Sequence, residues 1–407
     1  MSRDARLRVV VTGVGVVSAW GWGADRFWRG VLSGKHALGR LTRFEPDEYA
    51  TRIAGEVPLP AEAVPARPRL SFADRFALAA AREAVGHAGL DDGRSRVGTG
   101  VFFGSSTGGM YEGEAYYRSL KDRRGGRVRI AALASQQISA PAEAVARELG
   151  VCGPVETMSS ACASSTLSIG AAVDAVRDGS VRVALAGGAD SLCRTTYGGF
   201  NALRAVDERP CRPFRADRAG LSMGEGAAVL VLEREADAIE RGAVPLAEAI
   251  GSGASADANH MTAPDSTGRV PAQAMDRALA DAGVHPDEVD FINAHGTGTE
   301  LNDLAEYRAL EQVFGTRATE IPLTSTKGSV GHLLGSAGAI EAVATVLCLH
   351  HRQVHPTPGG GAIDPRTPVR LVTDSALSVH PLEVGLSLNL AFGGCNAALV
   401  FSRWQGE

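Results

Sequence analysis

The sequence predicts an α/β fold made of two successive series of strands and helices. Apolar, β-branched runs alternate with segments of helical periodicity along most of the chain, and a second such series begins near Ala247. With 407 residues, of which 44% are hydrophobic and 21% charged, the chain has ample material for a core. Strands that alternate with helices indicate a mainly parallel sheet covered on both faces. We therefore expect two halves, residues 1–245 and 246–407.

The first half begins with an apolar strand, Val9 to Val17, that is interrupted by Gly13 and Gly15. This stretch contains only part of a dinucleotide-binding fingerprint, because Ala19 stands where the third glycine would be. We therefore interpret it as a strand without a cofactor. Further strands are expected at 97–103, 181–186 and 226–232, and helices at 24–32, 71–88 and 141–149.

The second half repeats the alternation. Its expected elements are helices at 272–282, 303–314 and 337–350, a strand at 289–294 and a terminal pair of strands. In each half a strand runs into a glycine-marked turn that bears a reactive side chain, and a helix follows. The two halves are therefore expected to be related.

Composition excludes several classes of function. A net charge of −5 with scattered basic residues does not indicate nucleic-acid binding, and the small cluster from Lys121 to Arg129 is typical of a solvated loop. Six cysteines without a C-x-x-C pair argue against a zinc site and against a disulfide scaffold. The N-terminus does not resemble a signal peptide, and we expect no apolar segment long enough to span a membrane. The sequence thus predicts a cytoplasmic protein.

One predicted turn joins a strand to a helix around a cysteine. Gly153 to Met158 combines turn residues with a β-compatible run, and apolar residues after Cys162 follow helical spacing up to Gly179. Small residues leave the thiol uncrowded, and the first turn of a helix offers unpaired N–H groups and a positive dipole end that favour a thiolate. Cys162 is therefore a candidate nucleophile. The alternative is a buried cysteine that acts as a small apolar side chain.

Two histidines occupy similar turns in the second half. His295 ends a strand and is followed by Gly-Thr-Gly-Thr, and His332 lies in a glycine-flanked turn five residues after Lys327. Glycines permit close approach of a ligand, and threonine hydroxyls can donate hydrogen bonds. Taken singly, each histidine is more often structural. Together with Cys162 they indicate a shared site.

These motifs closely resemble those of the β-ketoacyl-acyl-carrier-protein synthases, the condensing enzymes of fatty acid and polyketide synthesis. The likeness rests on Ser-Ala-Cys-Ala-Ser around Cys162, His-Gly-Thr-Gly-Thr from His295, Lys-Gly-Ser-Val-Gly-His from Lys327, and Phe-Gly-Gly from Phe392. It extends over almost the whole chain. The resemblance implies a thiolase-like fold, in which two related α/β halves form a five-layered α-β-α-β-α arrangement, and a dimer.

The resemblance also implies a mechanism that needs no bound metal or redox cofactor. Cys162 would accept an acyl chain from the phosphopantetheine arm of an acyl carrier protein, and decarboxylation of malonyl-acyl-carrier protein would generate the carbon nucleophile that attacks this thioester. The implied roles are enolate stabilisation by His295 and His332, ordering of this cluster by Lys327 with Glu341, an oxyanion hole from the backbone N–H groups of Cys162 and Phe392, and pantetheine contacts from Thr297 and Thr299. Lys327 and Glu341 could instead form a plain structural ion pair.

The expected gate departs from the family pattern. It reads Leu390-Ala391-Phe392-Gly393-Gly394, so that Leu390 replaces a usual phenylalanine and Ala391 a usual glycine. Alanine restricts the backbone more than glycine does, and we expect the gate to move less freely. A second loop, from Asp257 to Asp265 with His260 inside it, matches one that moves with the gate.

The acyl pocket indicates the type of substrate. The resemblance assigns Thr107, Gln136 and Phe200 to this pocket, and the first two are more polar than the residues of an ordinary fatty acid enzyme. This difference favours a polyketide or polyene substrate over a fatty acid. The expected partners are an acyl carrier protein and either a second copy of the chain or a homologous chain-length factor.

Two other functions remain open. The chain itself could be a chain-length factor, a non-condensing partner subunit, but such subunits typically lose the cysteine found at position 162. A thiolase acting on coenzyme A thioesters would need a second catalytic cysteine, for which Cys395 is the candidate. The His-Gly-Thr-Gly-Thr motif favours a ketosynthase, and we interpret Cys395 as a buried small side chain.

Overall fold

The computed structural model describes residues 7–59, 69–90, 98–121 and 130–406. Most of the basic cluster expected after Lys121 and the first residue of the strand expected at 97–103 lie outside the described residues. The first half contains β1 (Val9–Ser18), β2 (Gly21–Trp22), α1 (Ala24–Leu32), β3 (Gly39–Arg40), β4 (Ile53–Ala54), α2 (Phe72–His87), β5 (Thr99–Gly104), α3 (Met110–Lys121), η2 (Ile130–Ser135), α4 (Ala140–Leu149), β6 (Val155–Met158), α5 (Ser164–Asp178), β7 (Val183–Asp190), α6 (Arg194–Ala202), β8 (Gly226–Arg234) and α7 (Glu235–Glu240).

The second half follows directly. Its elements are β9 (Ala247–Ala256), α8 (Arg269–Ala282), η3 (Pro286–Glu288), β10 (Phe291–Asn293), α9 (Glu300–Phe314), η4 (Gly315–Thr319), β11 (Pro322–Thr324), α10 (Lys327–Val330), η5 (Leu334–Ser336), α11 (Ala337–His351), β12 (Gln353–Val354), β13 (Arg370–Leu371), β14 (Leu377–Ser378), β15 (Val384–Leu390) and β16 (Cys395–Ser402). Every helix expected in this half is present. The sequence did not predict α3 and α6 in the first half, whose glycine and tyrosine content gives no clear helical pattern.

The strands form one large sheet with an internal repeat. The order is β13-β11-β10-β15-β16-β9-β1-β8-β7-β5-β6, and a short antiparallel pairing of β9 with β1 joins the two halves. The five main strands are β1, β5, β6, β7 and β8 in the first half and β9, β10, β11, β15 and β16 in the second. When the strands of each half are numbered along the chain, both halves have the spatial order third, second, fourth, fifth, first. In each half the second strand is parallel to the third and to the fourth, whereas the fifth strand is antiparallel to the fourth and to the first. The expectation of a mainly parallel sheet is therefore wrong, because helices and long loops also connect antiparallel neighbours in this fold.

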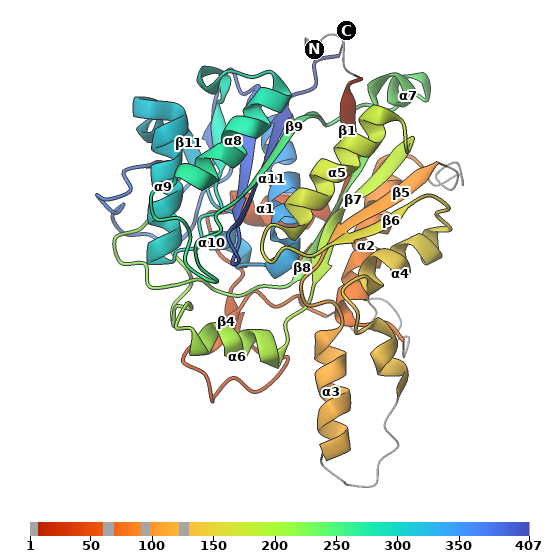
Figure 1. The fold of residues 1–407 in the computed structure, drawn as a ribbon, viewed down its shortest axis with the longest axis vertical. Coiled ribbons are helices and arrows are strands. Elements are labelled where there is room, and N and C mark those ends of the chain that lie inside the picture. The colour runs from red at the N-terminus through yellow and green to blue at the C-terminus, as the bar shows by residue number, and fades with distance from the viewer. Residues whose placement is uncertain (1–6, 60–68, 91–97, 122–129, 407) are drawn as a thin grey trace.

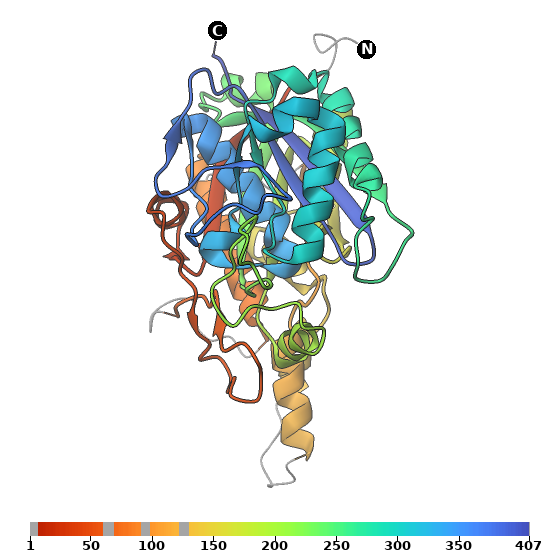
Figure 2. The ribbon, with the colours of Figure 1, turned by 90° about the vertical axis from the view of Figure 1, so that its left-hand side faces the viewer.

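Helices cover the sheet in layers, as expected (Figure 1). On the outer face of the first half, α2 and α4 contact the strands, and on the outer face of the second half α8 contacts β9 and β16 while α9 packs on α8. Between the halves, α5 and α11 pack against each other and against strands of both. These layers give the α-β-α-β-α arrangement, and the central helix layer positions the site described below. Figure 2 shows α3 projecting away from these layers.

The glycines of β1 serve packing. A Cβ on Gly15 would lie 2.0 Å from the carbonyl oxygen of Ala80, and one on Gly13 would lie 2.2 Å from that of Ala84. Both carbonyls belong to α2, which therefore lies directly on the backbone of β1. The glycines that interrupt the apolar run thus accommodate a helix, and the run itself is a strand, as the sequence predicts.

One stretch of the described chain, Leu334–His351, has the length and mean hydropathy of a membrane-spanning helix. The expectation that no apolar segment is long enough is therefore wrong. However, 89% of this stretch is buried inside the molecule, where α11 lies in the central helix layer. Its apolar character is accounted for by a core position.

Candidate active site

The turn between β6 and α5 presents Cys162 at a sharp bend, as the sequence predicts. Ala161 adopts a left-handed backbone with φ 45°, which is uncommon for a residue with a Cβ and indicates a locally constrained turn. The Ser164 hydroxyl donates to the Ala161 carbonyl at 2.6 Å and accepts from the Ser160 N–H at 2.8 Å. These bonds hold Cys162 just before the first turn of α5.

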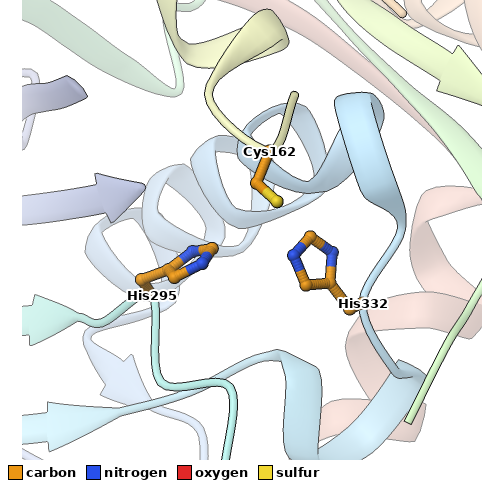
Figure 3. A group of neighbouring side chains, drawn as sticks. All are labelled: Cys162, His295 and His332. Carbon is orange, nitrogen blue, oxygen red and sulfur yellow. The ribbon is translucent and has the colours of Figure 1, made fainter. Parts of the chain in front are cut away.

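Cys162 meets both predicted histidines (Figure 3). His295 comes from the turn after β10, and His332 from the turn between α10 and η5. The sulfur and one nitrogen of each imidazole all lie within 4.8 Å of one another, and the two rings are nearly perpendicular with centroids 5.4 Å apart. All three side chains are buried. Three distant segments of the chain thus converge on one point.

The pKa of the Cys162 thiol differs from the expectation. Burial raises its pKa to about 11, although the nearby Lys327 ammonium and the backbone N–H of Phe392 act in the opposite direction. The expectation of a thiolate is therefore wrong for the free protein, since desolvation outweighs the Lys327 charge and the backbone N–H groups. The N–H groups of Phe392 and of Cys162 itself do lie at the sulfur, where the sequence predicts an oxyanion hole.

Both histidines are neutral hydrogen-bond donors toward the site. Burial, reinforced by the Lys327 charge, lowers the pKa of each imidazole well below its ordinary value. The Leu334 N–H donates to Nδ1 of His332 at 3.0 Å. Nδ1 of His295 receives the Lys327 ammonium at 3.0 Å. Because each Nδ1 accepts, each Nε2 carries the proton.

The tautomers decide whether a metal fits this group. Cys162, His295 and His332 have the donor atoms of a zinc site and lie close enough together. A metal-bound imidazole normally donates its other N–H to an acceptor. In this site both Nδ1 atoms accept instead, which leaves no lone pair on Nε2 for a cation. The arrangement suits two N–H donors better than two metal ligands.

Lys327 belongs to a buried network behind His295. Its ammonium contacts Oε1 of Glu341, and Oε2 of Glu341 accepts from the Asn389 amide at 2.8 Å. The same amide nitrogen lies 3.2 Å from Nδ1 of His295, and the Thr166 hydroxyl donates to the amide oxygen. Thus the predicted pair of Lys327 and Glu341 is present, but it is an ion pair that also touches the imidazole.

A further carboxylate holds the His295 turn. Glu306, on α9, accepts the backbone N–H groups of His295 at 2.6 Å and Gly296 at 2.8 Å. Burial raises the pKa of Glu306 to about 8. Glu306, Asn389 and Thr166 were not predicted from the sequence. The only sequence signal for any of them was the position of Asn389, just before the gate.

A pocket of about 340 Å³ is lined by all three members of the site. Its wall also includes Thr297 and Thr299, the predicted pantetheine contacts, whose hydroxyls lie 2.9 Å apart. The remaining predicted residues in this wall are Phe200, Leu390, Ala391 and Phe392. Phe200 stacks on Phe392 with ring centroids 5.6 Å apart, so the two aromatic rings close one side of the pocket.

The two predicted gating loops touch each other. The Gly393 N–H donates to the Met261 carbonyl and the Asp257 N–H donates to the Gly394 carbonyl, both at 2.8 Å. A Cβ on Gly394 would lie 2.7 Å from that of Asp257. His260 stabilises its own loop, since its Nδ1 accepts two backbone N–H groups. Movement of one loop without the other must therefore break these hydrogen bonds.

Two predicted pocket residues lie elsewhere in this chain. The Thr107 hydroxyl donates to the buried Asp190 carboxylate at 2.9 Å, and Gln136 is exposed beside α3. Neither lines the pocket that contains Cys162. Cys395, the candidate second cysteine of a thiolase, also lies outside the pocket wall and packs in the small apolar cluster around Cys162.

Fold and site together define a protein of the thiolase-like class with one cysteine and two histidines. Residues 6–238 match the family described as "Beta-ketoacyl synthase, N-terminal domain" and residues 246–360 the family "Beta-ketoacyl synthase, C-terminal domain". The chain belongs to the β-ketoacyl synthase family. It is 35% identical to a "3-oxoacyl-[acyl-carrier-protein] synthase 2" of Staphylococcus aureus (strain MRSA252), over 98% of this chain and 99% of that protein.

Solved structures support the same membership. The chain is similar to "The ishigamide ketosynthase/chain length factor", with a TM-score of 0.93 and 33% identity over 98% of this chain and 100% of that one. It is also similar to a type II PKS ketosynthase in complex with its acyl-carrier protein, with a TM-score of 0.88 and 31% identity over 98% of this chain and 100% of that one. The thiolase-like ketosynthase fold is confirmed.

Proposed function

We propose that this protein catalyses the decarboxylative condensation of an acyl group held on Cys162 with malonyl-acyl-carrier protein. One observation carries the proposal: two neutral imidazoles, both protonated on Nε2, face the same pocket as the thiol. Two donors at one point suit a developing enolate oxygen. Both imidazoles donate through Nε2–H while they stay neutral, because burial lowers their pKa values well below the ordinary value.

Acylation of Cys162 is the first step. The sulfur attacks the thioester carbonyl of the acyl-carrier protein, the new S–C bond replaces the old one, and the departing pantetheine thiol takes the proton that Cys162 loses. The backbone N–H groups of Cys162 and Phe392 stabilise the tetrahedral oxyanion. Because the free thiol is protonated, its charge develops only as the bond forms.

Condensation is the second step. The bond between the malonyl carboxylate and its α-carbon breaks, carbon dioxide leaves, and the electron pair forms an enolate at the thioester carbonyl. The Nε2–H groups of His295 and His332 donate to this oxygen. The α-carbon then attacks the Cys162 thioester, and the sulfur leaves as a thiolate beside the Lys327 charge. Thr297 and Thr299 position the pantetheine arm along the pocket.

The carrier protein would dock at the mouth of the pocket. Arg204 lines this mouth with an exposed side chain and a left-handed backbone of φ 53°, and Leu203 and Leu301 beside it are more than half exposed. An arginine held in a strained turn next to apolar side chains suits a partner that brings both a phosphate and an apolar surface.

A type II polyketide or polyene pathway is our preferred setting, with a homologous chain-length factor or a second copy of the chain as the partner subunit. The similarity to ketosynthases of such systems supports this choice over primary fatty acid synthesis. The presence of Cys162 and both histidines argues against the chain itself being a chain-length factor, and the position of Cys395 argues against a thiolase. Six free cysteines suit a reducing cytoplasm.

Intact-mass analysis tests the proposal. We expect acyl-carrier proteins of some chain length to leave an acyl adduct on Cys162 but not on a Cys162→Ala variant. Addition of malonyl-carrier protein should remove the adduct and yield a β-ketoacyl-carrier protein. Repeating the assay with a co-expressed partner subunit and with varied chain lengths distinguishes the pathways. Coenzyme A thioesters acting equally well without a carrier protein would favour a thiolase.

A further inference from the structure

Asn389 belongs to the buried network beside His295, although the sequence did not predict it as a site residue. It lies on β15, is completely buried, and points its amide into the space between His295, Glu341 and Thr166. Its amide oxygen accepts from the Thr166 hydroxyl, and its nitrogen faces Oε2 of Glu341 at 2.8 Å and Nδ1 of His295 at 3.2 Å. An amide nitrogen has two hydrogens and can only donate. Both donors are therefore used.

Two hydrogen bonds fix the direction of the Asn389 amide. Its nitrogen donates to Oε2 of Glu341, and its oxygen Oδ1 accepts from the Thr166 hydroxyl. There is little room for rearrangement, since a Cβ on Gly338 of α11 would lie 2.0 Å from the Thr166 hydroxyl and 2.8 Å from Oδ1 of Asn389. The amide thus presents an N–H to His295 and cannot present its oxygen without breaking two bonds.

Lys327 divides its ammonium between two acceptors, Oε1 of Glu341 and Nδ1 of His295. The three hydrogens of an ammonium rotate about a flexible stem, so the lysine alone does not fix a donor at Nδ1. The Asn389 amide is planar, and its hydrogen bonds to Glu341 and Thr166 fix its direction.

We propose that Asn389 is a positioning residue that holds His295 in the Nε2–H tautomer, because its fixed amide N–H is aimed at Nδ1 beside the rotatable Lys327 ammonium. This inference rests on the proposed condensing function, because that tautomer matters when Nε2–H donates to the enolate. His332 needs no equivalent side chain, since the Leu334 N–H fixes its tautomer through the backbone.

The test replaces the amide by the isosteric acid. Asn389→Asp turns the donor toward Nδ1 into an acceptor, which favours the Nδ1–H tautomer and removes one donor from the enolate site. We expect release of carbon dioxide from malonyl-carrier protein to fall by about 100-fold or more, as for the loss of one oxyanion donor. Acylation of Cys162 should change by only a few-fold, because this step does not use His295.

Two further measurements separate positioning from a merely structural role. In nitrogen-15 NMR spectra of histidine-labelled protein, His295 should give the Nε2–H signature in the wild type and lose it in Asn389→Asp. Acidification should partly restore decarboxylation by Asn389→Asp, because a protonated acid can donate as the amide does. Asn389→Ala removes the donor without adding charge and should reduce decarboxylation at every pH.

Asn293→Asp is the matched control. Asn293 is also a completely buried asparagine, but its described hydrogen bonds go to the Glu341 carbonyl and two threonines rather than to His295. We expect this variant to retain decarboxylation within a few-fold. The inference is overturned if Asn389→Asp keeps the Nε2–H signature, or if both Asn→Asp variants lose acylation and decarboxylation alike. A wild type with the Nε2–H signature but without decarboxylation would instead contradict the proposed function.

Discussion

In the proposed reaction His295 and His332 both donate to the enolate oxygen during condensation, and neither takes part in the acylation of Cys162. We therefore expect His295→Ala to accept an acyl group on Cys162 at nearly the wild-type rate and to lose malonyl decarboxylation by about 100-fold or more. Intact mass follows the adduct, and release of labelled carbon dioxide follows the second step. His36→Ala, which removes an exposed imidazole away from the pocket, is the control. Unchanged decarboxylation in His295→Ala would mean that this imidazole does not stabilise the enolate.

The pKa of Cys162 makes a second prediction at the same scale. Because burial raises it to about 11, the thiolate fraction must increase with pH throughout the neutral range. Alkylation of Cys162 by iodoacetamide should accelerate about tenfold per pH unit from pH 6 to 10. Peptide mapping separates Cys162 from the exposed Cys152. A rate that is already constant between pH 6 and 8 would indicate a preformed thiolate instead of a protonated thiol.

The contact between the two gating loops predicts different effects of alanine at two neighbouring glycines. Gly393 and Gly394 both have positive φ, and alanine at either position is strained by roughly 1–2 kcal/mol. Only at Gly394 would the added Cβ also meet the second loop, 2.7 Å from that of Asp257, whereas a Cβ on Gly393 would meet no described atom within 4 Å.

Gly394→Ala should therefore separate the loops and alter the rate of acylation more strongly than Gly393→Ala does. Stopped-flow or quenched-flow mass measurements compare these rates, and circular dichroism confirms that both variants fold. Equal effects of the two substitutions would mean that contact between the loops does not control entry to the pocket.

The packing of α2 on β1 gives a prediction about stability. Gly15→Ala forces a methyl group to within 2.0 Å of a helix carbonyl, so β1 and α2 must move apart. We expect the free energy of unfolding in urea to fall by about 1–3 kcal/mol or more, as for other overpacked cores. Gly39→Ala is the control, because a Cβ at that position meets no described atom within 4 Å. A Gly15→Ala variant as stable as Gly39→Ala would refute the packing interpretation.

At the scale of the whole molecule, β6 forms one end of the large sheet, with no further strand beside it among the described residues. Val155 on this edge is 41% exposed, and an apolar edge strand favours pairing with another chain. We expect Val155→Lys to weaken the proposed dimer. Light scattering should then detect monomer, while Val244→Lys, at a site 71% exposed, should leave the oligomeric state unchanged. A Val155→Lys protein that remains fully dimeric would exclude this edge as the interface.

Much of this molecule could be predicted from local patterns, and the exceptions have physical causes. Helical periodicity located α2, α5, α8, α9 and α11, and the glycine-marked turns identified Cys162, His295 and His332. Strand direction was not predictable, because a connecting helix is compatible with either direction when the connection is long. Asn389 and Thr166 became visible only when β15 and α5 were brought together. The Cys162 pKa depends on burial, which a strand-turn-helix pattern does not specify.

Two predictions stay untested: the division of the chain at residues 245 and 246, and the individual roles of the site residues.

One measurement decides whether Cys162 carries the acyl group of a condensation. The protein is incubated with acyl-carrier proteins of several chain lengths and then with malonyl-carrier protein, and both protein and carrier are weighed by mass spectrometry. We expect an acyl adduct on Cys162 that disappears as a carrier-bound β-ketoacyl product forms. Absence of any adduct on Cys162, with or without a partner subunit, would contradict the proposed condensation.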